Sequence, residues 1–300
     1  DRRLGPQTAK YREIGTVANL SVFNRLGSLP VHNFQKGSFP SVERLSGETL
    51  REEHGNRAQG CASCTIRCER QYRTREGAHQ RLEYETLFAF GPHCGLEEPD
   101  AILEAARLCD EYGLDTISTG GTIAWAIECV EKNLLPWKKQ KKICFGDSGQ
   151  ILELIRNIAA RRGLGSLLAD GSARASRLLG GGSEAFAIHV KGLQLPGYEP
   201  RSLKTLALGL AVSPRGACHN RSGAYEADFS GRVDRFRGSA DRGGIVVASE
   251  DFSAVLDSLV VCKFLRRCFS DFYAESAQIL NTVTGWSLSG EDLRRVGERI

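Results

Sequence analysis

The chain has 300 residues, with 40 Lys and Arg against 36 Asp and Glu, so its formal charge is only +4. This length allows one large or two ordinary domains, and the apolar and charged fractions are those of a soluble globular protein. So small a charge, without a basic run interleaved with aromatics, argues against a nucleic-acid partner. No apolar stretch approaches a membrane span, and the start of the chain does not read as a signal peptide.

Cysteine usage indicates a reducing compartment. Ten cysteines in 300 residues are too sparse for a disulfide scaffold, and seven of them are scattered singly. Reduced thiols together with one local cluster predict a cytoplasmic protein. The chain begins at Asp1 and contains no methionine, so we expect it to be a piece of a longer protein.

Hydrophobic periodicity predicts a mainly α-helical fold. Apolar residues recur at helical spacing, and glycine or proline marks the ends of the segments. Between them, residues 43–59 are expected to be helical in part, residues 185–190 extended, and residues 216–244 loop-like. The expected helices span residues 11–26, 82–90, 99–112, 122–132, 151–161, 167–179, 205–212, 252–269 and 271–281, and a last one starts with a capping sequence at Ser289.

A candidate domain boundary lies in residues 193–201, which contain Pro196, Gly197 and Pro200. We therefore expect two helical domains, formed by residues 1–192 and 193–300.

Three thiols lie within eight residues, at Cys61, Cys64 and Cys68. On a helix or a tight turn, spacings of three and four place all three sulfurs on one side. This suits a cubane iron–sulfur cluster, which takes four thiolates. Zinc is an alternative, although structural zinc sites usually combine two separated pairs or include histidine. Three buried cysteines that bind nothing are a third alternative, but the flanking Arg67 and Arg70 do not resemble core residues.

The fourth thiolate of such a cluster has to come from elsewhere in the chain. Cys262 and Cys268 lie on or near one expected helix, and Cys262 has the better context because it follows the segment that begins at Asp257. Residues 110–115 have the same outline, since each segment has an aspartate near a helix end, a short apolar stretch and a polar or thiol residue five positions on.

Taken together, five segments resemble the aldehyde ferredoxin oxidoreductase family of tungsten, sometimes molybdenum, bis-pterin enzymes. The resemblance runs over essentially the whole chain and covers the second and third domains of the family. The segments that carry it are Cys61-x-x-Cys64-x-x-x-Cys68, Tyr84-Glu85-Thr86-Leu87-Phe88, residues 110–118, residues 213–219 and Leu256-Asp257-Ser258-Leu259-x-x-Cys262.

The resemblance implies two kinds of cofactor, held at a cleft between two helical domains. A [4Fe–4S] cluster would be bound by Cys61, Cys64, Cys68 and Cys262. A tungstopterin or molybdopterin centre would be bound by Asp110, Gly113, Leu114, Asp115, Asp257 and Val261. Carboxylates are good acceptors for the N–H groups of a pterin ring, and glycine permits close approach of the backbone. From the residues alone, Asp110 could equally be a solvated acid at a helix end.

Glu85 and His219 match the acid/base and the hydrogen-bond donor of the substrate pocket in the family. A carboxylate can accept a proton, and an imidazole can polarise a carbonyl or bind an oxyanion. The alternatives are a surface carboxylate for Glu85 and a loop histidine bonded to backbone for His219. We expect both side chains to face one apolar pocket near the ends of the Asp110 and Asp257 helices, further from the cysteines than the pterins are.

The implied activity is oxidation of an aldehyde to a carboxylic acid, with electrons leaving through the cluster to ferredoxin or a similar acceptor. A relative within the family could instead run as a reductase. A non-catalytic iron–sulfur electron-transfer subunit is another alternative. A radical enzyme that cleaves S-adenosylmethionine is less favoured, because that chemistry favours a three-then-two spacing between the cysteines.

Two departures from the family pattern concern partners. The family builds its first pterin-binding domain before the segment seen here, so that N-terminal domain is expected as a missing partner. Some members carry a Glu-x-x-His pair for a metal between subunits, whereas the matching position reads Glu104-Ala105-Ala106-Arg107. A homo-oligomer is thus compatible with the resemblance, but the chain lacks the histidine of that metal site.

Overall fold

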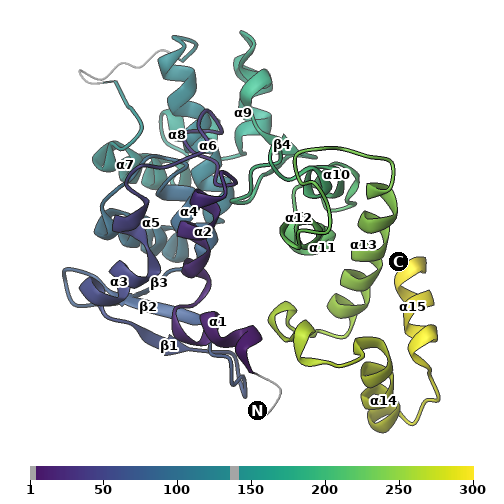
Figure 1. Ribbon diagram of the computed structural model, residues 1–300. Coiled ribbons are helices and arrows are strands. Elements are labelled where there is room, and N and C mark those ends of the chain that lie inside the picture. The colour runs from purple at the N-terminus through teal and green to yellow at the C-terminus, as the bar shows by residue number, and fades with distance from the viewer. Residues whose placement is uncertain (1–4, 136–141) are drawn as a thin grey trace. The chain divides into compact units, whose positions relative to one another are not determined.

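The computed structural model describes residues 5–135 and 142–300 and is mainly helical, as predicted. The chain forms two compact units (Figure 1). The first comprises Lys10–Glu199, and the second combines the chain start up to Ala9 with Pro200–Ile300. Whether residues 1–192 and 193–300 act as domains remains a prediction. We describe each unit by itself.

Nine α-helices and two small antiparallel sheets are described in the first unit or at its border. The sheets are β1 (Arg57–Gln59), β2 (Glu69–Arg73) and β3 (His79–Arg81), paired in that order, and the hairpin of β4 (His189–Val190) and β5 (Leu193–Gln194). The helices are α1 (Ala9–Glu13), α2 (Asn19–Arg25), α3 (Gly47–His54), α4 (Tyr84–Phe90), α5 (Pro99–Tyr112), α6 (Thr116–Glu131), α7 (Ser148–Ala159), α8 (Leu164–Leu168) and α9 (Ser172–Leu179).

Helix α6 forms the core of the first unit and packs against α4. All of its residues from Thr119 to Val130 are buried, and the Trp125 indole is fully enclosed. Gly120 permits the close approach of the two helices, because a Cβ there would lie 2.6 Å from the Ala89 carbonyl oxygen. The helix was expected from residue 122 and begins at Thr116, because the Asp115 carboxylate accepts a hydrogen bond from Ser118 N at 2.7 Å and caps it.

The sheet β1–β2–β3 was not predicted. In the register, Arg70 faces Ala58, and Tyr72 faces Gln80. The inward positions of β2 and β3 are Arg70, Tyr72 and Gln80, which are all buried. Because two of these three side chains are polar, the alternation does not read as the apolar pattern of a half-buried strand. The sheet holds both ends of the three-cysteine segment, which connects β1 to β2.

The second unit is built around α13 (Arg242–Ser258), which packs against three other helices of that unit. Its apolar core contains Val255, Leu256, Phe272, Ala277 and Leu293. The predicted cap at Ser289 is confirmed, since its hydroxyl accepts from Asp292 N and the Asp292 carboxylate accepts from Ser289 N. The other elements are α10 (Lys204–Val212), α11 (His219–Ser222), α12 (Tyr225–Phe229), the 3₁₀ helix η5 (Lys263–Cys268), α14 (Phe272–Thr284) and α15 (Gly290–Arg299).

Two sequence predictions for the second unit were wrong. The helix expected over residues 252–269 ends at Ser258, because Val260 adopts a left-handed backbone with φ of 55°. Cys262 therefore lies between two helices and not on one. The stretch 216–244, expected as a loop, contains the short helices α11 and α12.

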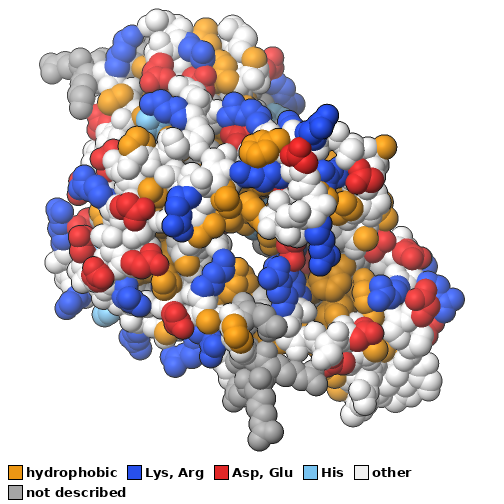
Figure 2. Space-filling model, viewed as in Figure 1, with side chains coloured by type: hydrophobic (Ala, Val, Ile, Leu, Met, Phe, Trp, Pro, Cys, Tyr) orange, Lys and Arg blue, Asp and Glu red, His pale blue; other side chains and the backbone are white. Residues whose placement is uncertain are grey.

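The viewed face of the molecule carries basic and acidic side chains intermixed (Figure 2). This agrees with the small net charge of the chain. Within the described residues, no helix has both the length and the apolar character needed to cross a membrane.

Candidate functional site

The three clustered cysteines lie in the loop between β1 and β2. The loop is not helical. A backbone hydrogen bond joins Cys64 N to the Cys61 carbonyl at 3.0 Å, and Ser63 and Arg67 both have positive φ. Cys61 is exposed, whereas the other two thiols are partly buried. In the part of the chain that the structure describes, no three Cys, His, Asp or Glu side chains are arranged to hold a metal ion. The support for a cluster here is therefore the chemistry of the three thiols and not their arrangement. Cysteine thiolates are the ligands that iron–sulfur clusters use.

Asp110 and Asp257 lie in the last turns of α5 and α13, as predicted, and the two helices end in the same way. At the end of α5, Leu114 N donates to the Cys109 carbonyl at 2.9 Å, and Gly113 N to the Asp110 carbonyl at 3.4 Å. At the end of α13, the matching bonds run from Val261 N to Leu256 and from Val260 N to Asp257, both at 3.0 Å. Both are Schellman endings, with an aspartate in the same position of each.

The two helix ends differ at the left-handed residue. Gly113 has φ of 65°, and a Cβ added there would meet no atom within 4 Å. The equivalent residue of α13 is Val260, whose φ is 55° and whose side chain is 90% exposed. A β-branched residue in this region is a genuine outlier, because its Cβ crowds the backbone. The end of α13 is therefore strained where the end of α5 is relaxed.

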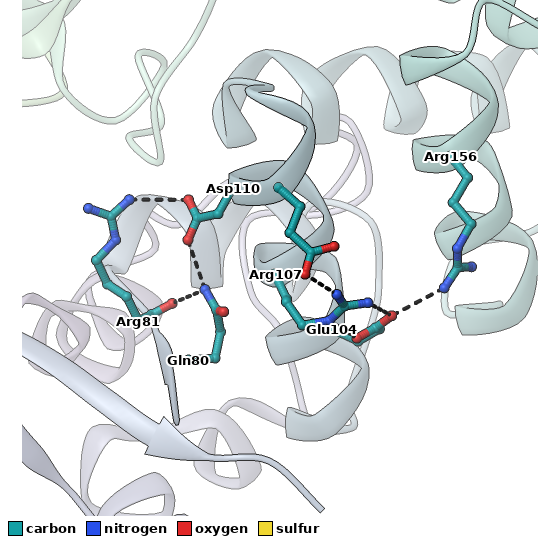
Figure 3. A network of polar contacts seen from close by, with 7 residues as sticks. Gln80, Arg81, Glu104, Arg107, Asp110 and Arg156 are labelled. Atoms are coloured by element: carbon teal, nitrogen blue, oxygen red, sulfur yellow. Dashed lines mark hydrogen bonds and ion pairs between the residues drawn. The ribbon is translucent and has the colours of Figure 1, made fainter. Parts of the chain in front are cut away.

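A pocket of about 160 Å³ lies at the end of α5 and contains most of the first predicted pterin segment. Asp110 sits at its edge, with one oxygen accepting from Gln80 Nε2 at 2.9 Å and the other from Arg81 at 3.2 Å (Figure 3). The carboxylate is nevertheless 45% exposed and keeps lone pairs free to accept further N–H groups. The walls of the pocket include Arg81, Thr86, Asp110, Leu114, Asp115 and Thr116.

Glu85 lies in the first turn of α4, next to the pocket residue Thr86. Its Oε2 accepts a hydrogen bond from Gly197 N at 2.8 Å. Burial raises the pKa of Glu85 to about 8, an effect that the Gly197 hydrogen bond opposes and the Asp115 carboxylate reinforces. A carboxyl group whose pKa lies near neutrality can both take up and release a proton there.

Gly197 is the residue that fixes this carboxylate, and sequence reasoning missed it. The Tyr84 hydroxyl donates to its carbonyl oxygen, while its N–H donates to Glu85. A Cβ at this position would lie 2.7 Å from both the Tyr84 hydroxyl and the Phe88 ring. Two neighbouring residues of α4 thus bind the N–H and the carbonyl of Gly197. Only glycine fits at this position without a shift of its neighbours.

His219 begins α11 in the second unit and is partly buried. Burial, with Lys263 adding to the effect, lowers its pKa to about 3. The imidazole is therefore neutral at physiological pH and can donate one N–H. Lys263, which sequence reasoning also missed, donates to the Asn220 carbonyl and lies 5.9 Å from the centre of the Tyr225 ring. Since Lys263 directly follows Cys262, it ties the His219 helix to the segment of the fourth predicted cluster ligand.

Comparison with known proteins shows the family to which the chain is related. The family model described as "Aldehyde ferredoxin oxidoreductase, domains 2 & 3" matches residues 3–300. The chain belongs to the aldehyde ferredoxin oxidoreductase family. It is 34% identical to the tungsten-containing aldehyde ferredoxin oxidoreductase of Thermococcus kodakarensis and 33% identical to that of Pyrococcus furiosus. Each alignment covers 95% of the chain and 48% of the relative, so the chain spans about half the length of these curated relatives.

A solved structure supports the fold of this family. The active site complex BamBC of benzoyl coenzyme A reductase superposes with a TM-score of 0.74 at 16% identity. The superposition covers 95% of the chain and 50% of that protein. At so low an identity, the likeness is evidence for the fold alone.

The segment Glu104-Ala105-Ala106-Arg107, for which the resemblance implied a missing metal-binding histidine, takes part in an ion-pair network. Arg107 Nε donates to Glu104 Oε2 at 2.7 Å, and Arg156 donates to the other oxygen at 3.1 Å (Figure 3). Arg107 also pairs with Glu111 one turn further along α5. A guanidinium cannot coordinate a cation. This face of α5 is therefore occupied by charge pairs, which also link it to Arg156 of α7.

Replacing Val260 with glycine is expected to stabilise the chain by about 0.5–1 kcal/mol, despite removing a side chain. The change relieves left-handed strain of about 1–2 kcal/mol, which exceeds the entropic cost of glycine, and little burial is lost at 90% exposure. Urea unfolding measures the effect. Val247→Gly is the matched control, because Val247 is an exposed valine inside α13, where glycine destabilises. A loss of stability in Val260→Gly equal to that of the control would contradict the strain at Val260.

Proposed function

We propose that the protein containing this chain oxidises an aldehyde to a carboxylic acid at a tungsten or molybdenum bis-pterin centre. In this reaction an aldehyde and water yield the acid, two protons and two electrons. The electrons leave through a [4Fe–4S] cluster to ferredoxin or a similar acceptor. The chain supplies two of the family's domains, and an N-terminal domain would complete the pterin site.

The observation that carries this proposal is the pair of equivalent helix ends. Each presents a half-exposed carboxylate, 45% for Asp110 and 57% for Asp257, beside the same turn of backbone. Two equivalent acceptors suit two ligands of one kind whose rings carry N–H donors, as pterins do. At the first end, the pocket residues Leu114 and Asp115, together with the neighbouring Gly113, would border the ring. At the second end, Val261 takes the position of Leu114.

The chain's own residues would perform the proton chemistry. When bound, the metal centre would supply the redox chemistry, and the oxygen that the aldehyde gains would come from water. Glu85 would take up a proton at its carboxylate, which Gly197 N–H orients at 2.8 Å. His219, as a neutral imidazole, would donate an N–H to the substrate oxygen as negative charge develops there. Cys61, Cys64, Cys68 and Cys262 would hold the cluster through their thiolates.

Cofactor analysis of the full-length protein tests the proposal against its main alternative. We expect about four irons per chain, together with tungsten or molybdenum, organic pterin, and reduction of a dye that depends on added aldehyde. Iron without pterin, tungsten or molybdenum would favour a non-catalytic electron-transfer subunit. Reduction of an acid or thioester, without any oxidation of aldehydes, would favour a family member that works as a reductase.

A further inference from the structure

Arg70 is a fully buried arginine two residues after the last clustered cysteine. It lies on β2 and is 1% exposed. Its Nη1 donates to the Arg67 carbonyl at 2.7 Å and to the Glu69 carbonyl at 3.0 Å. Its Nη2 donates to the Tyr11 carbonyl at 3.2 Å and to that of Arg12. One guanidinium therefore binds four backbone carbonyls from two parts of the first unit.

Two of these carbonyls stand on either side of Cys68. The Arg67 and Glu69 peptides are its immediate neighbours, so the guanidinium fixes the backbone that orients this thiol. The other two carbonyls belong to the last turn of α1. Gly15 packs against the same place with φ of 83°, and a Cβ there would lie 2.6 Å from Arg70 Cγ and 2.8 Å from the Cys68 carbonyl. The end of the cysteine loop is thus clamped to α1 through Arg70.

The positive charge of Arg70 has no carboxylate in contact with it. None of the ion pairs formed within residues 5–135 and 142–300 includes Arg70, and its buried Nε has no hydrogen-bond partner. Carbonyls are neutral acceptors, so they satisfy the N–H groups without balancing the charge. Burying a cation that has no ion-pair partner is costly, and arginine remains protonated in proteins. The Glu83 carboxylate acts on Arg70 from outside contact distance, but the cost of burial exceeds this effect. An anionic group bound beside the loop would supply the missing charge.

We infer that Arg70 is a positioning residue for the iron–sulfur cluster, which holds Cys68 in place and sets the cluster's reduction potential through its fixed charge. This inference rests on the proposed function, because it takes Cys61, Cys64, Cys68 and Cys262 as the cluster ligands. A cubane cluster with four thiolates is anionic and becomes more so when reduced. A nearby buried cation therefore stabilises the reduced form more than the oxidised one and raises the potential.

The two roles of Arg70 are separable by substitution in the full-length protein with its cofactors bound. Arg70→Lys keeps the charge but replaces the planar fork with a single ammonium group. Arg70→Gln removes the charge and keeps a shorter donor. Arg73→Gln is the matched control, since Arg73 lies on the same strand and is exposed. Three measurements apply: iron content, the midpoint potential of the cluster followed by electron paramagnetic resonance, and hydrogen exchange of amides 61–68.

We expect a lower midpoint potential in Arg70→Gln, a potential near the wild-type value in Arg70→Lys, and faster exchange of the loop amides in both. Arg73→Gln should match the wild type in all three measurements. If Arg70→Gln does not fold, faster loop exchange in Arg70→Lys supports the positioning role, and a changed potential in Arg70→Lys contradicts the charge role. An unchanged potential in Arg70→Gln, or unchanged exchange in Arg70→Lys, overturns the inference and leaves the proposed function intact. A wild-type protein without iron overturns both.

Discussion

Replacing Glu85 with glutamine should lower turnover by about 10²-fold or more, the usual scale for losing a general acid or base. Cluster, pterin and metal content should not change, because glutamine has nearly the same shape and still accepts the Gly197 hydrogen bond. In the wild type, the pKa of Glu85 of about 8 means that a base at this position becomes available as the pH rises through 8. The pH–rate profile should therefore rise across this range and lose that limb in Glu85→Gln.

At alkaline pH, Glu85→Gln should be more stable than the wild type. The pKa of Glu85 is raised in the folded chain, so the native state binds more protons than the unfolded state between pH of about 4.5 and 8. Wild-type stability consequently falls as the pH rises through that window, whereas a glutamine does not titrate. Thermal unfolding at pH 5 and pH 9 measures the difference. Glu76→Gln, at an exposed turn, is the control and should show no such gain.

A matching test applies to His219, the second predicted catalytic residue. His219→Ala should lower turnover by about 10²–10³-fold, as the loss of one oxyanion donor does. Wild-type rates in Glu85→Gln and His219→Ala, with all cofactors present, would remove the catalytic assignment. The cluster assignment would remain, because it depends on different residues.

Replacing Cys262 with serine should abolish or strongly perturb the iron–sulfur cluster, whereas Cys268→Ser should not. Cys262 is exposed and precedes η5, and Cys268 lies six residues further on, at the end of η5, and is partly buried. Iron content and the broad visible absorption of the cluster report the loss. Both changes remove one thiol from one segment, so each serves as the control of the other.

The result of this pair decides which thiol is the remote ligand. If Cys268→Ser abolishes the cluster and Cys262→Ser retains it, the assignment of Cys262 is wrong. Loss of the cluster in neither variant would show that the fourth ligand lies elsewhere. In either case, the three thiols of the β1–β2 loop can be tested by the same measurements.

Much of the helical architecture was predictable because it depends on local apolar spacing. Helices α5, α7 and α14 lie close to their expected ranges, since each has one continuous apolar face. The ends were harder to predict. Helix α13 stops at Ser258 because Val260 turns left-handed, and no local rule assigns that conformation to a valine. The strands around the cysteine loop were missed because Arg70 occupies an inward position that pattern reading reserves for apolar residues.

The site was predictable in its residue types and not in its contacts. The carboxylates and thiols were chosen from motifs, whereas their partners lie far away in sequence. Asp110 of α5 is bound by Gln80 and Arg81, which lie on β3, before α4 in the chain. Glu85 is bound by Gly197, 112 residues later. Such pairs depend on tertiary packing, which single-sequence periodicity does not encode.

The contact between α4 and Gly197 also sets the order in which the first unit can be completed during synthesis. Tyr84 and Glu85 leave the ribosome long before Gly197, and Glu199 N then closes the unit by donating to the Ser28 carbonyl at 3.0 Å. Domains generally fold as units during translation. A nascent chain that stops before residue 197 therefore lacks the N–H group that orients Glu85, however well its helices have formed. The proton-handling carboxylate becomes oriented only when the last residues of its unit have emerged.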